Sequence, residues 1–167
     1  MPLIFQYGSN MSGKRLNGPE RLNGAATDLG LVVTRDPFEY AFDVWSSTNR
    51  CAAADIVVAR NGRQIWGVLY DIPDQCMPSL DRIEGVGANY CRHEIAVTTS
   101  NGVDIPGPVF TYTVRQPKAG LKTNLDYVNY ILSGLTDHFA PPEYVQYVRS
   151  RIIENNPTLH DCLPATP

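Results

Sequence analysis

The sequence predicts an α+β fold with a mostly antiparallel, barrel-like β-sheet and peripheral helices. Three observations lead to this class. Short segments rich in β-branched and aromatic residues follow one another before residue 115. Turn signals separate them, of which Asn61-Gly62 and Asn101-Gly102 are the clearest. After residue 123 the apolar residues change to helical spacing. Consecutive hairpins of this kind favour a sheet that is strongly curved or closed.

The strands are expected wherever these apolar segments alternate or run continuously. The first is short and buried and ends at a glycine, Gly8. Asn61-Gly62 predicts a hairpin between the fourth strand and the fifth. The expected strands cover residues 3–7, a segment beginning with 29–33, and residues 40–45, 52–59, 64–70, 91–98 and 109–114.

Helices are expected in three places. Asn10 or Ser12 caps a short helix after the first strand. A helical stretch runs from residue 73 to Glu84, where Gly85 is a plausible terminator. Near the end, Thr123 or Asn124 caps one helix and Pro141-Pro142 begins another.

We predict a single domain, because no repeat, low-complexity block or linker divides the chain. We assign residues 1–155 to this domain and expect residues 156–167, around Pro157, to form a loosely ordered tail. The composition supports a packed core, since 43% of the residues are hydrophobic and 19% are charged.

The composition also excludes several classes of protein. A net charge of −3 with scattered basic residues argues against nucleic-acid binding. No apolar run approaches the ~18 residues of a membrane span, and no export signal is visible, so a cytoplasmic protein with reduced thiols is expected. The four cysteines and three histidines lack metal-ligand spacing, and no nucleotide-binding glycine loop is present. We therefore expect no metal and no cofactor.

The first candidate for chemistry is the loop Tyr7-Gly8-Ser9-Asn10, between a strand and a helix start. Such a turn leaves backbone N–H groups unpaired, and these groups bind carboxylates or oxyanions. Gly8 allows a ligand to approach closely, and Ser9 and Asn10 add side-chain donors. The alternative is an ordinary turn in which Asn10 or Ser12 only caps a helix.

The second candidate is Glu84, at the end of Leu80-Asp81-Arg82-Ile83-Glu84-Gly85. A carboxylate beside a terminating glycine can project into a cleft, where burial raises its pKa toward neutral pH. Negative charge is also unfavourable at a helix C-terminus, which hints at a function. The alternative is a solvated surface glutamate. Several tyrosines near apolar elements either pack in the core or line a pocket with their hydroxyl groups.

These motifs, in this order, resemble the γ-glutamyl cyclotransferase family and its AIG2-like relatives. The family's loop signature stands here as Tyr7-Gly8-Ser9-Asn10-Met11, and its Trp-Gly-Val strand as Trp66-Gly67-Val68. Its Leu-Asp-x-x-Glu-Gly motif, whose glutamate is the catalytic acid/base, stands here as Leu80 to Gly85. The tyrosines that match family positions are Tyr90, Tyr112 and Tyr127.

The resemblance implies a barrel-like core with surrounding helices, no cofactor, and release of 5-oxoproline from γ-glutamyl compounds. It implies that Glu84 is the acid/base and that the loop, Met11 included, binds substrate with the tyrosines Tyr7, Tyr90, Tyr112 and Tyr127. The expected partner is a small-molecule γ-glutamyl substrate, with no nucleic acid and no membrane, for a monomer or homodimer. Two alternatives remain: the same chemistry on a specialised γ-glutamyl-amine intermediate, or a non-catalytic relative that binds a small metabolite.

Overall fold

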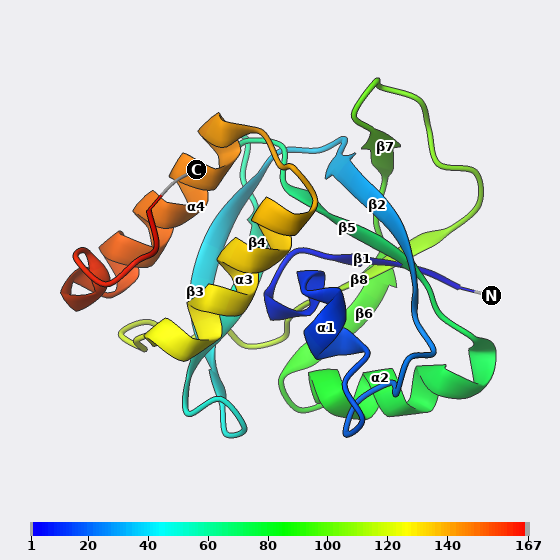
Figure 1. Cartoon of the computed structure of the whole chain (residues 1–167), viewed down its shortest axis with the longest axis horizontal. Helices are drawn as coiled ribbons and strands as arrows, with labels where there is room; N and C mark the ends of the chain where they lie inside the picture. The colour runs from blue at the N-terminus through cyan, green and yellow to red at the C-terminus, as the bar shows by residue number, and fades with distance from the viewer. Residues whose placement is uncertain (1, 166–167) are drawn as a thin grey trace.

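Two β-sheets form the centre of the computed structural model, which describes residues 2–165 (Figure 1). The larger sheet has six strands in the order β6-β8-β1-β5-β2-β7, and the smaller one is the hairpin β3-β4. The strands are β1 Leu3–Gln6, β2 Thr27–Thr34, β3 Phe38–Ser46, β4 Cys51–Val58, β5 Trp66–Asp71, β6 Tyr90–Glu94, β7 Val97–Thr99 and β8 Val109–Val114.

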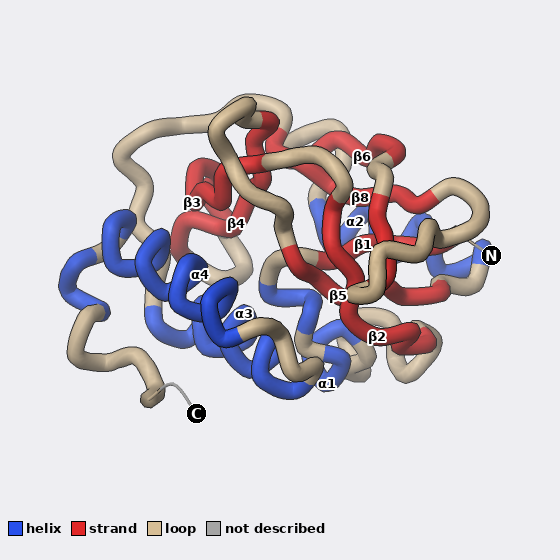
Figure 2. The backbone as a smooth tube through the Cα atoms, turned by 90° about the horizontal axis from the view of Figure 1, so that it is seen from above, coloured by secondary structure: helices blue, strands red, loops and turns tan. Residues whose placement is uncertain are grey.

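The larger sheet curls into a half barrel (Figure 2). Its strands β6 and β7 lie at opposite edges, yet only two residues separate them in the sequence. Three Cα–Cα steps cover at most about 11 Å, so the two edges must approach each other there. Within residues 2–165, every strand pair is antiparallel except β1 with β8. The predicted α+β class with a mostly antiparallel, barrel-like sheet is confirmed.

The predicted hairpin around Asn61-Gly62 is wrong. Strand β4 pairs with β3, whereas β5 pairs with β1 and β2 in the other sheet. After the turn, Arg63 exchanges two backbone hydrogen bonds of 2.9 Å with Phe38 at the start of β3. A Cβ atom on Gly62 would lie 2.4 Å from the Phe38 carbonyl oxygen. Glycine is therefore needed for this close approach between chain segments and not for a two-residue hairpin.

Within residues 2–165, four α-helices surround the sheets: α1 Gly13–Leu16, α2 Met77–Glu84, α3 Leu125–Asp137 and α4 Pro142–Asn155. Asn124, one of the two predicted caps, accepts a hydrogen bond from the Tyr127 N–H at 2.9 Å and so caps α3. Gly85 ends α2 in the left-handed conformation, with φ of 65°. The described part of the chain also has three short 3₁₀ helices: η1 Ser9–Met11, η2 Asp74–Cys76 and η3 Pro157–Leu159.

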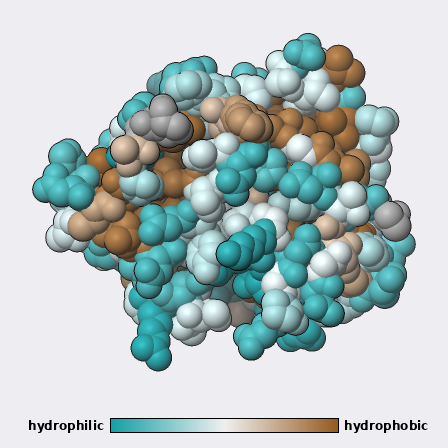
Figure 3. Space-filling view, in the orientation of Figure 1, coloured by the Kyte–Doolittle hydropathy of each residue, from teal (hydrophilic) through white to brown (hydrophobic). Residues whose placement is uncertain are grey.

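The C-terminal helices hold the β3-β4 hairpin and the η1 loop in place. Helix α3 packs against η1, and α4 lies along β3, where the Arg151 Nε donates a 2.8 Å hydrogen bond to the Tyr40 carbonyl oxygen. In the view of Figure 3, hydrophilic side chains cover much of the surface over α1 and α3. No helix between residues 2 and 165 is long and apolar enough to cross a membrane.

The segment after α4, for which the sequence predicts loose order, includes η3. Leu159 and Leu163 are buried against the core, and the Asn156 side chain donates a 2.8 Å hydrogen bond to the Thr123 carbonyl oxygen. Residues 166 and 167 of the predicted tail lie outside the described residues.

Candidate functional site

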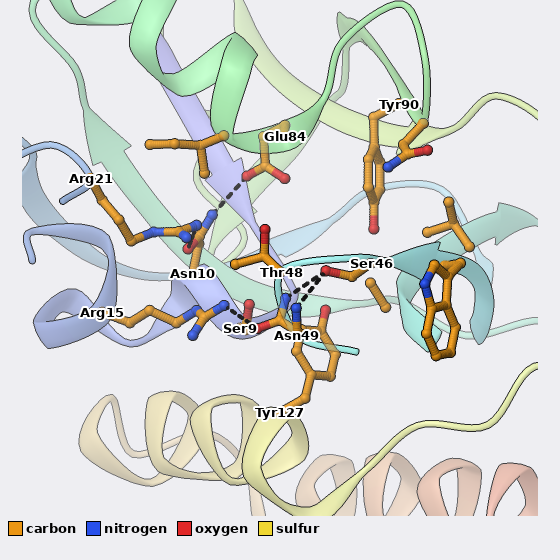
Figure 4. Close-up of a pocket in the computed structure, with 15 residues that line it drawn as sticks. Ser9, Asn10, Arg15, Arg21, Ser46, Thr48, Asn49, Glu84, Tyr90 and Tyr127 are labelled. Atoms are coloured by element: carbon orange, nitrogen blue, oxygen red, sulfur yellow. Dashed lines mark hydrogen bonds between the residues drawn. The ribbon is translucent and has the colours of Figure 1, made fainter. Parts of the chain in front are cut away.

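Two neighbouring pockets share Glu84 where the η1 loop, the β3-β4 turn, α2 and α3 meet, and Figure 4 shows one of them. We describe them as two lobes of one cavity. One part, which we call the tyrosine lobe, has a volume of about 30 Å³. The other, the arginine lobe, has a volume of about 70 Å³. The residues that line both lobes are Ser9, Asn10, Glu84, Tyr90 and Tyr127.

The two lobes differ in their remaining residues. Those of the tyrosine lobe come mainly from β1, its following loop and β4: Gln6, Tyr7, Gly8, Ala54 and Tyr112. Those of the arginine lobe include two arginines and the β3-β4 turn: Arg15, Arg21, Val44, Trp45, Ser46, Thr48, Asn49, Ala53, Ile83 and Asn89.

The Glu84 carboxylate is held from one side only. The Asn10 side-chain N–H donates to Glu84 Oε1 at 2.7 Å, and the Gln6 amide lies 3.4 Å from the same oxygen. Arg21 in turn donates to the Asn10 Oδ1 at 2.7 Å, which fixes the orientation of the Asn10 amide. Among the described residues, no donor reaches Oε2 of Glu84. That oxygen is available to a ligand.

The surroundings of Glu84 act on its pKa in two directions. Burial has the largest effect and raises the pKa of the carboxyl group above its ordinary value. The charge of Arg21 and the hydrogen bonds from Asn10 and Gln6 oppose this effect. The balance favours a carboxylate that accepts a proton more readily than a solvated glutamate does, which suits a general base.

The η1 loop lines the cavity and contains backbone donors without a partner. Ser9 and Asn10 are buried, yet no group in the described part of the chain accepts a hydrogen bond from the backbone N–H of Gly8, Ser9 or Asn10. A Cβ atom on Gly8 would make ordinary contacts, 3.5 Å from Ala54 Cβ and 3.6 Å from the Tyr127 Oη. Folding therefore does not require glycine here, but its absent side chain leaves space in the tyrosine lobe. Buried, unpaired N–H groups are costly unless a ligand accepts from them.

Two tyrosine hydroxyl groups meet at Ala54 of β4. The Tyr90 hydroxyl donates to the Ala54 carbonyl oxygen at 2.7 Å, and the Ala54 N–H donates to the Tyr127 Oη at 2.9 Å. Tyr127 therefore accepts one backbone hydrogen bond, and the Ser9 side chain also interacts with its hydroxyl group. Burial raises its pKa to about 12, so the hydroxyl stays protonated at neutral pH.

Tyr7 and Tyr112 connect the tyrosine lobe to α2. The Tyr7 hydroxyl donates to the Tyr112 carbonyl oxygen at 2.6 Å, and the Tyr112 hydroxyl donates to Asp81 Oδ1 at 2.8 Å. Arg92 donates to both Asp81 oxygens at 3.0 Å. These hydroxyl protons are already used within the protein, so Tyr7 and Tyr112 shape the lobe and position α2.

Met11 differs from the other predicted site residues, because it lines neither lobe. Its side chain is fully buried, and its backbone oxygen accepts a 3.1 Å hydrogen bond from the Tyr70 hydroxyl. The η1 turn directs Met11 toward Gly134 of α3. Met11 therefore packs beneath the loop, and its contact with substrate stays a prediction.

Sequence reasoning missed several residues of the cavity. Arg15 lies in the short helix α1 and Arg21 in the segment that follows it, and nothing in the sequence separates them from the other basic residues. The β3-β4 turn, which contributes Asn49, carries no motif either. Gln6 had a usable signal, because it is a polar residue at the end of a buried strand that leads into the predicted loop.

The charged groups indicate what the cavity can hold. One carboxylate, Glu84, faces two guanidinium groups, Arg15 and Arg21. Between residues 2 and 165, no group of three or more His, Cys, Asp and Glu side chains could hold a metal ion. The side chains and free N–H groups therefore suit a small organic molecule that carries both negative charge and an amine.

A second buried carboxylate, Asp55, lies directly after Ala54 and predicts a pH effect on stability. It is 2% exposed, and its Oδ1 accepts a 2.9 Å hydrogen bond from the Val114 N–H. Burial raises its pKa from 3.8 to about 6. The folded state therefore favours the protonated form of Asp55. The stability that protonated Asp55 contributes is complete below about pH 4 and is lost as the pH rises through about 6.

Between pH 4 and pH 8, the free energy of unfolding of the wild type should decrease more than that of Asp55→Asn. We expect this extra decrease to reach up to about 3 kcal/mol. The amide can still accept the bond from Val114 but does not ionise. Urea denaturation of both proteins at several pH values measures the difference. Parallel curves across this range would show that Asp55 does not titrate as its burial requires.

The sequence and the fold both have relatives among known proteins. A family model described as the AIG2-like family matches residues 64–148, slightly more than half of the chain. This match includes the Trp66-Gly67-Val68 strand, Glu84, Tyr90, Tyr112 and Tyr127. No curated protein matches the sequence.

Several solved structures share the fold. One described as a γ-glutamyl cyclotransferase is 24% identical, with a TM-score of 0.79 over 89% of this chain and 86% of its own. The human protein loc79017, described as uncharacterized, is also 24% identical, with a TM-score of 0.78 and the same coverage of 89% and 86%. A yeast γ-glutamyl cyclotransferase specific to glutathione is 11% identical, with a TM-score of 0.61 over 95% of this chain and 98% of its own. At these identities the likeness establishes the fold.

Proposed function

The chain belongs to the AIG2-like family, and from this membership and the geometry of the cavity we propose that it is a γ-glutamyl cyclotransferase. It would release 5-oxoproline and an amine or amino acid from a γ-glutamyl compound. One observation carries the proposal: the free Oε2 of Glu84 and the unpaired N–H groups of Gly8, Ser9 and Asn10 share one cavity.

The reaction needs a base, because the attacking group is the α-ammonium of the γ-glutamyl residue. Glu84 Oε2 takes a proton from this ammonium, and the free amine attacks the γ-carbonyl carbon of the same residue. A C–N bond forms and closes a five-membered ring. The amide bond to the leaving group then breaks, and Glu84 returns the proton to the departing nitrogen. The ring nitrogen loses its second proton as the lactam forms, and the departing amine takes up this proton as well and leaves as an ammonium ion.

The remaining groups of the tyrosine lobe hold the folded substrate. Bringing the amine to the carbonyl carbon of the same molecule is a matter of proximity and orientation, and a narrow lobe restricts the substrate to such bent conformers. The N–H groups of Ser9 and Asn10 and the hydroxyl group of Tyr127 are donors for the oxyanion or the α-carboxylate. Every group that the scheme requires is supplied by this chain.

Incubation with a panel of γ-glutamyl amino acids and γ-glutamyl amines tests the proposal. We expect release of 5-oxoproline, measured by liquid chromatography, from at least one member of the panel. We also expect this activity to survive exhaustive chelation and dialysis. Binding of γ-glutamyl compounds without release of 5-oxoproline would contradict the proposal and favour a metabolite-binding role.

A further inference from the structure

A short chain of hydrogen bonds leads from Arg21 through Asn10 to Glu84. The Arg21 guanidinium donates to Asn10 Oδ1 and the Asn10 side-chain N–H donates to Glu84 Oε1, both at 2.7 Å. Figure 4 shows Asn10 between the other two side chains. In the part of the chain that the structure describes, Arg21 forms no salt bridge with a carboxylate. Its hydrogen-bonded connection to Glu84 therefore runs through Asn10.

The direction of these hydrogen bonds follows from the chemistry of the two ends. A guanidinium group only donates, so the Asn10 amide must turn its oxygen toward Arg21. Its N–H group then faces Glu84 and requires an acceptor there. An ionised carboxylate only accepts, and it accepts such a bond more strongly than a neutral carboxyl group does. The amide orientation that Arg21 imposes therefore favours the ionised form of Glu84, which is the form that can take a proton.

The segment between α1 and β2 holds the backbone of Arg21 in place. Asn17 closes this segment, because its side chain exchanges two hydrogen bonds of 2.9 Å with the backbone of Ala26. Inside it, the Arg21 N–H donates to the Gly18 carbonyl oxygen at 3.0 Å, and the neighbouring Leu22 is buried in the core. The guanidinium group thus extends from a fixed backbone, as a residue that orients another must do.

The charge of Arg21 acts on Glu84 in the same direction as the hydrogen bonds. Burial raises the pKa of Glu84, and the charge of Arg21 is the largest of the effects that lower it, with Arg15 contributing less. Four hydroxyl groups also face Glu84 but stay neutral near neutral pH, because burial raises the pKa of each: Tyr7, Tyr90, Tyr112 and Tyr127. On α2 itself, Asp81 pairs with Arg92 and Arg82 is exposed.

We propose that Arg21 is a positioning residue for the general base: through Asn10 it keeps Glu84 ionised and oriented, with Oε2 free for the substrate ammonium. The proposal rests on the proposed function for the role of Glu84 as the base. In this role Arg21 acts through Asn10 and does not contact the reacting atoms.

Titration of Glu84 by carbon-13 NMR tests the proposal without turnover. In protein labelled at the glutamate side-chain carboxyl carbon, the signal that is lost in Glu84→Gln belongs to Glu84, and its change with pH gives the pKa. Arg21→Met removes both the charge and the donor to Asn10. We expect it to increase the proton affinity of Glu84 by a factor of about ten or more. Arg21→Lys keeps the charge but not the planar group and should retain part of the wild-type effect.

The pH dependence of kcat/KM is a second measurement. In the wild type, kcat/KM should rise with pH as Glu84 ionises. In Arg21→Met this rise should move to higher pH, so the loss relative to wild type should be about tenfold or more at pH 5 and smaller at pH 8. A purely structural role of Arg21 would instead lower kcat/KM by the same factor at every pH.

Arg82→Met is the matched control. The same exchange removes a guanidinium group two residues before Glu84, but Arg82 is exposed and lines neither lobe. It should change neither the titration of Glu84 nor the pH profile. Circular dichroism confirms that each variant is folded, and Arg21→Gln, which also removes the charge, replaces Arg21→Met if the methionine variant does not fold.

The outcomes separate this proposal from the proposed function. An unchanged titration of Glu84 in the folded Arg21 variants, an equal change in Arg82→Met, or an unmoved pH profile in an active enzyme would overturn the positioning role of Arg21. Release of 5-oxoproline together with any of these results would leave the proposed function standing. If no γ-glutamyl compound releases 5-oxoproline while the titration of Glu84 still depends on Arg21, the proposed function fails and the control of Glu84 by Arg21 stands.

Discussion

Replacing Glu84 with glutamine is expected to abolish cyclisation while the domain stays folded. The amide is nearly isosteric and can still accept from Asn10, but it cannot take a proton from the substrate ammonium at neutral pH. General acid/base groups contribute about 10²–10⁴-fold, so kcat should fall by at least that order. Burial raises the pKa of Glu84, so its ionised form costs stability near neutral pH, and the variant should be at least as stable as the wild type there.

Asp81→Asn is the control for this experiment. Asp81 lies one turn earlier on α2, and the substitution is the same exchange of carboxylate for amide. Its oxygens accept from Tyr112 and Arg92 and do not line the cavity. The measurements are 5-oxoproline release and thermal unfolding of both variants. A folded Glu84→Gln protein with more than about a tenth of wild-type turnover would reject the assignment.

Replacing Gly134 with alanine is expected to displace the η1 loop and so to impair activity at a distance from the cavity. A Cβ atom on Gly134 would lie 2.6 Å from Met11 Cβ and 2.9 Å from the Met11 carbonyl carbon. The backbone of the loop cannot yield as a flexible side chain would. Overpacking typically costs about 1–3 kcal/mol, more than the roughly 1 kcal/mol that alanine gains over glycine in a helix.

The displaced loop carries Ser9 and Asn10, and Asn10 holds Glu84. A shift of about 1 Å in such groups can cost about 10²-fold in rate, so we expect a loss of that size in kcat. Ser133→Ala, on the exposed side of the same helix, should change neither activity nor stability by much. Kinetics and urea denaturation of both variants measure the effects. Wild-type kcat in a folded Gly134→Ala protein would show that the loop tolerates the added methyl group.

Local features of the sequence were sufficient for most of the secondary structure. The α3 cap, predicted as Thr123 or Asn124, and the terminating Gly85 depend on a few neighbouring residues, and the structure shows Asn124 and Gly85 in these positions. The helical spacing from Leu125 onward likewise predicted α3. Periodicity and capping are short-range properties, so they can be recognised without knowing what packs against each element.

The pairing of the strands could not be predicted in this way. The Asn61-Gly62 pair is typical of a hairpin, but the close approach of Gly62 to Phe38 sends the chain into another sheet. Which strands become partners depends on contacts between residues far apart in the sequence, and the turn residues do not encode them.

The sequence determined the loop and Glu84 as candidates, because each has a local pattern and a family resemblance. Tertiary structure alone placed them around one cavity, added Arg15 and Arg21, and buried Met11 beneath the loop. The arginines are ordinary surface residues in the sequence. They become a charged pair only because η1, α1 and the β3-β4 turn fold onto the end of α2, which buries their Nε atoms without partners.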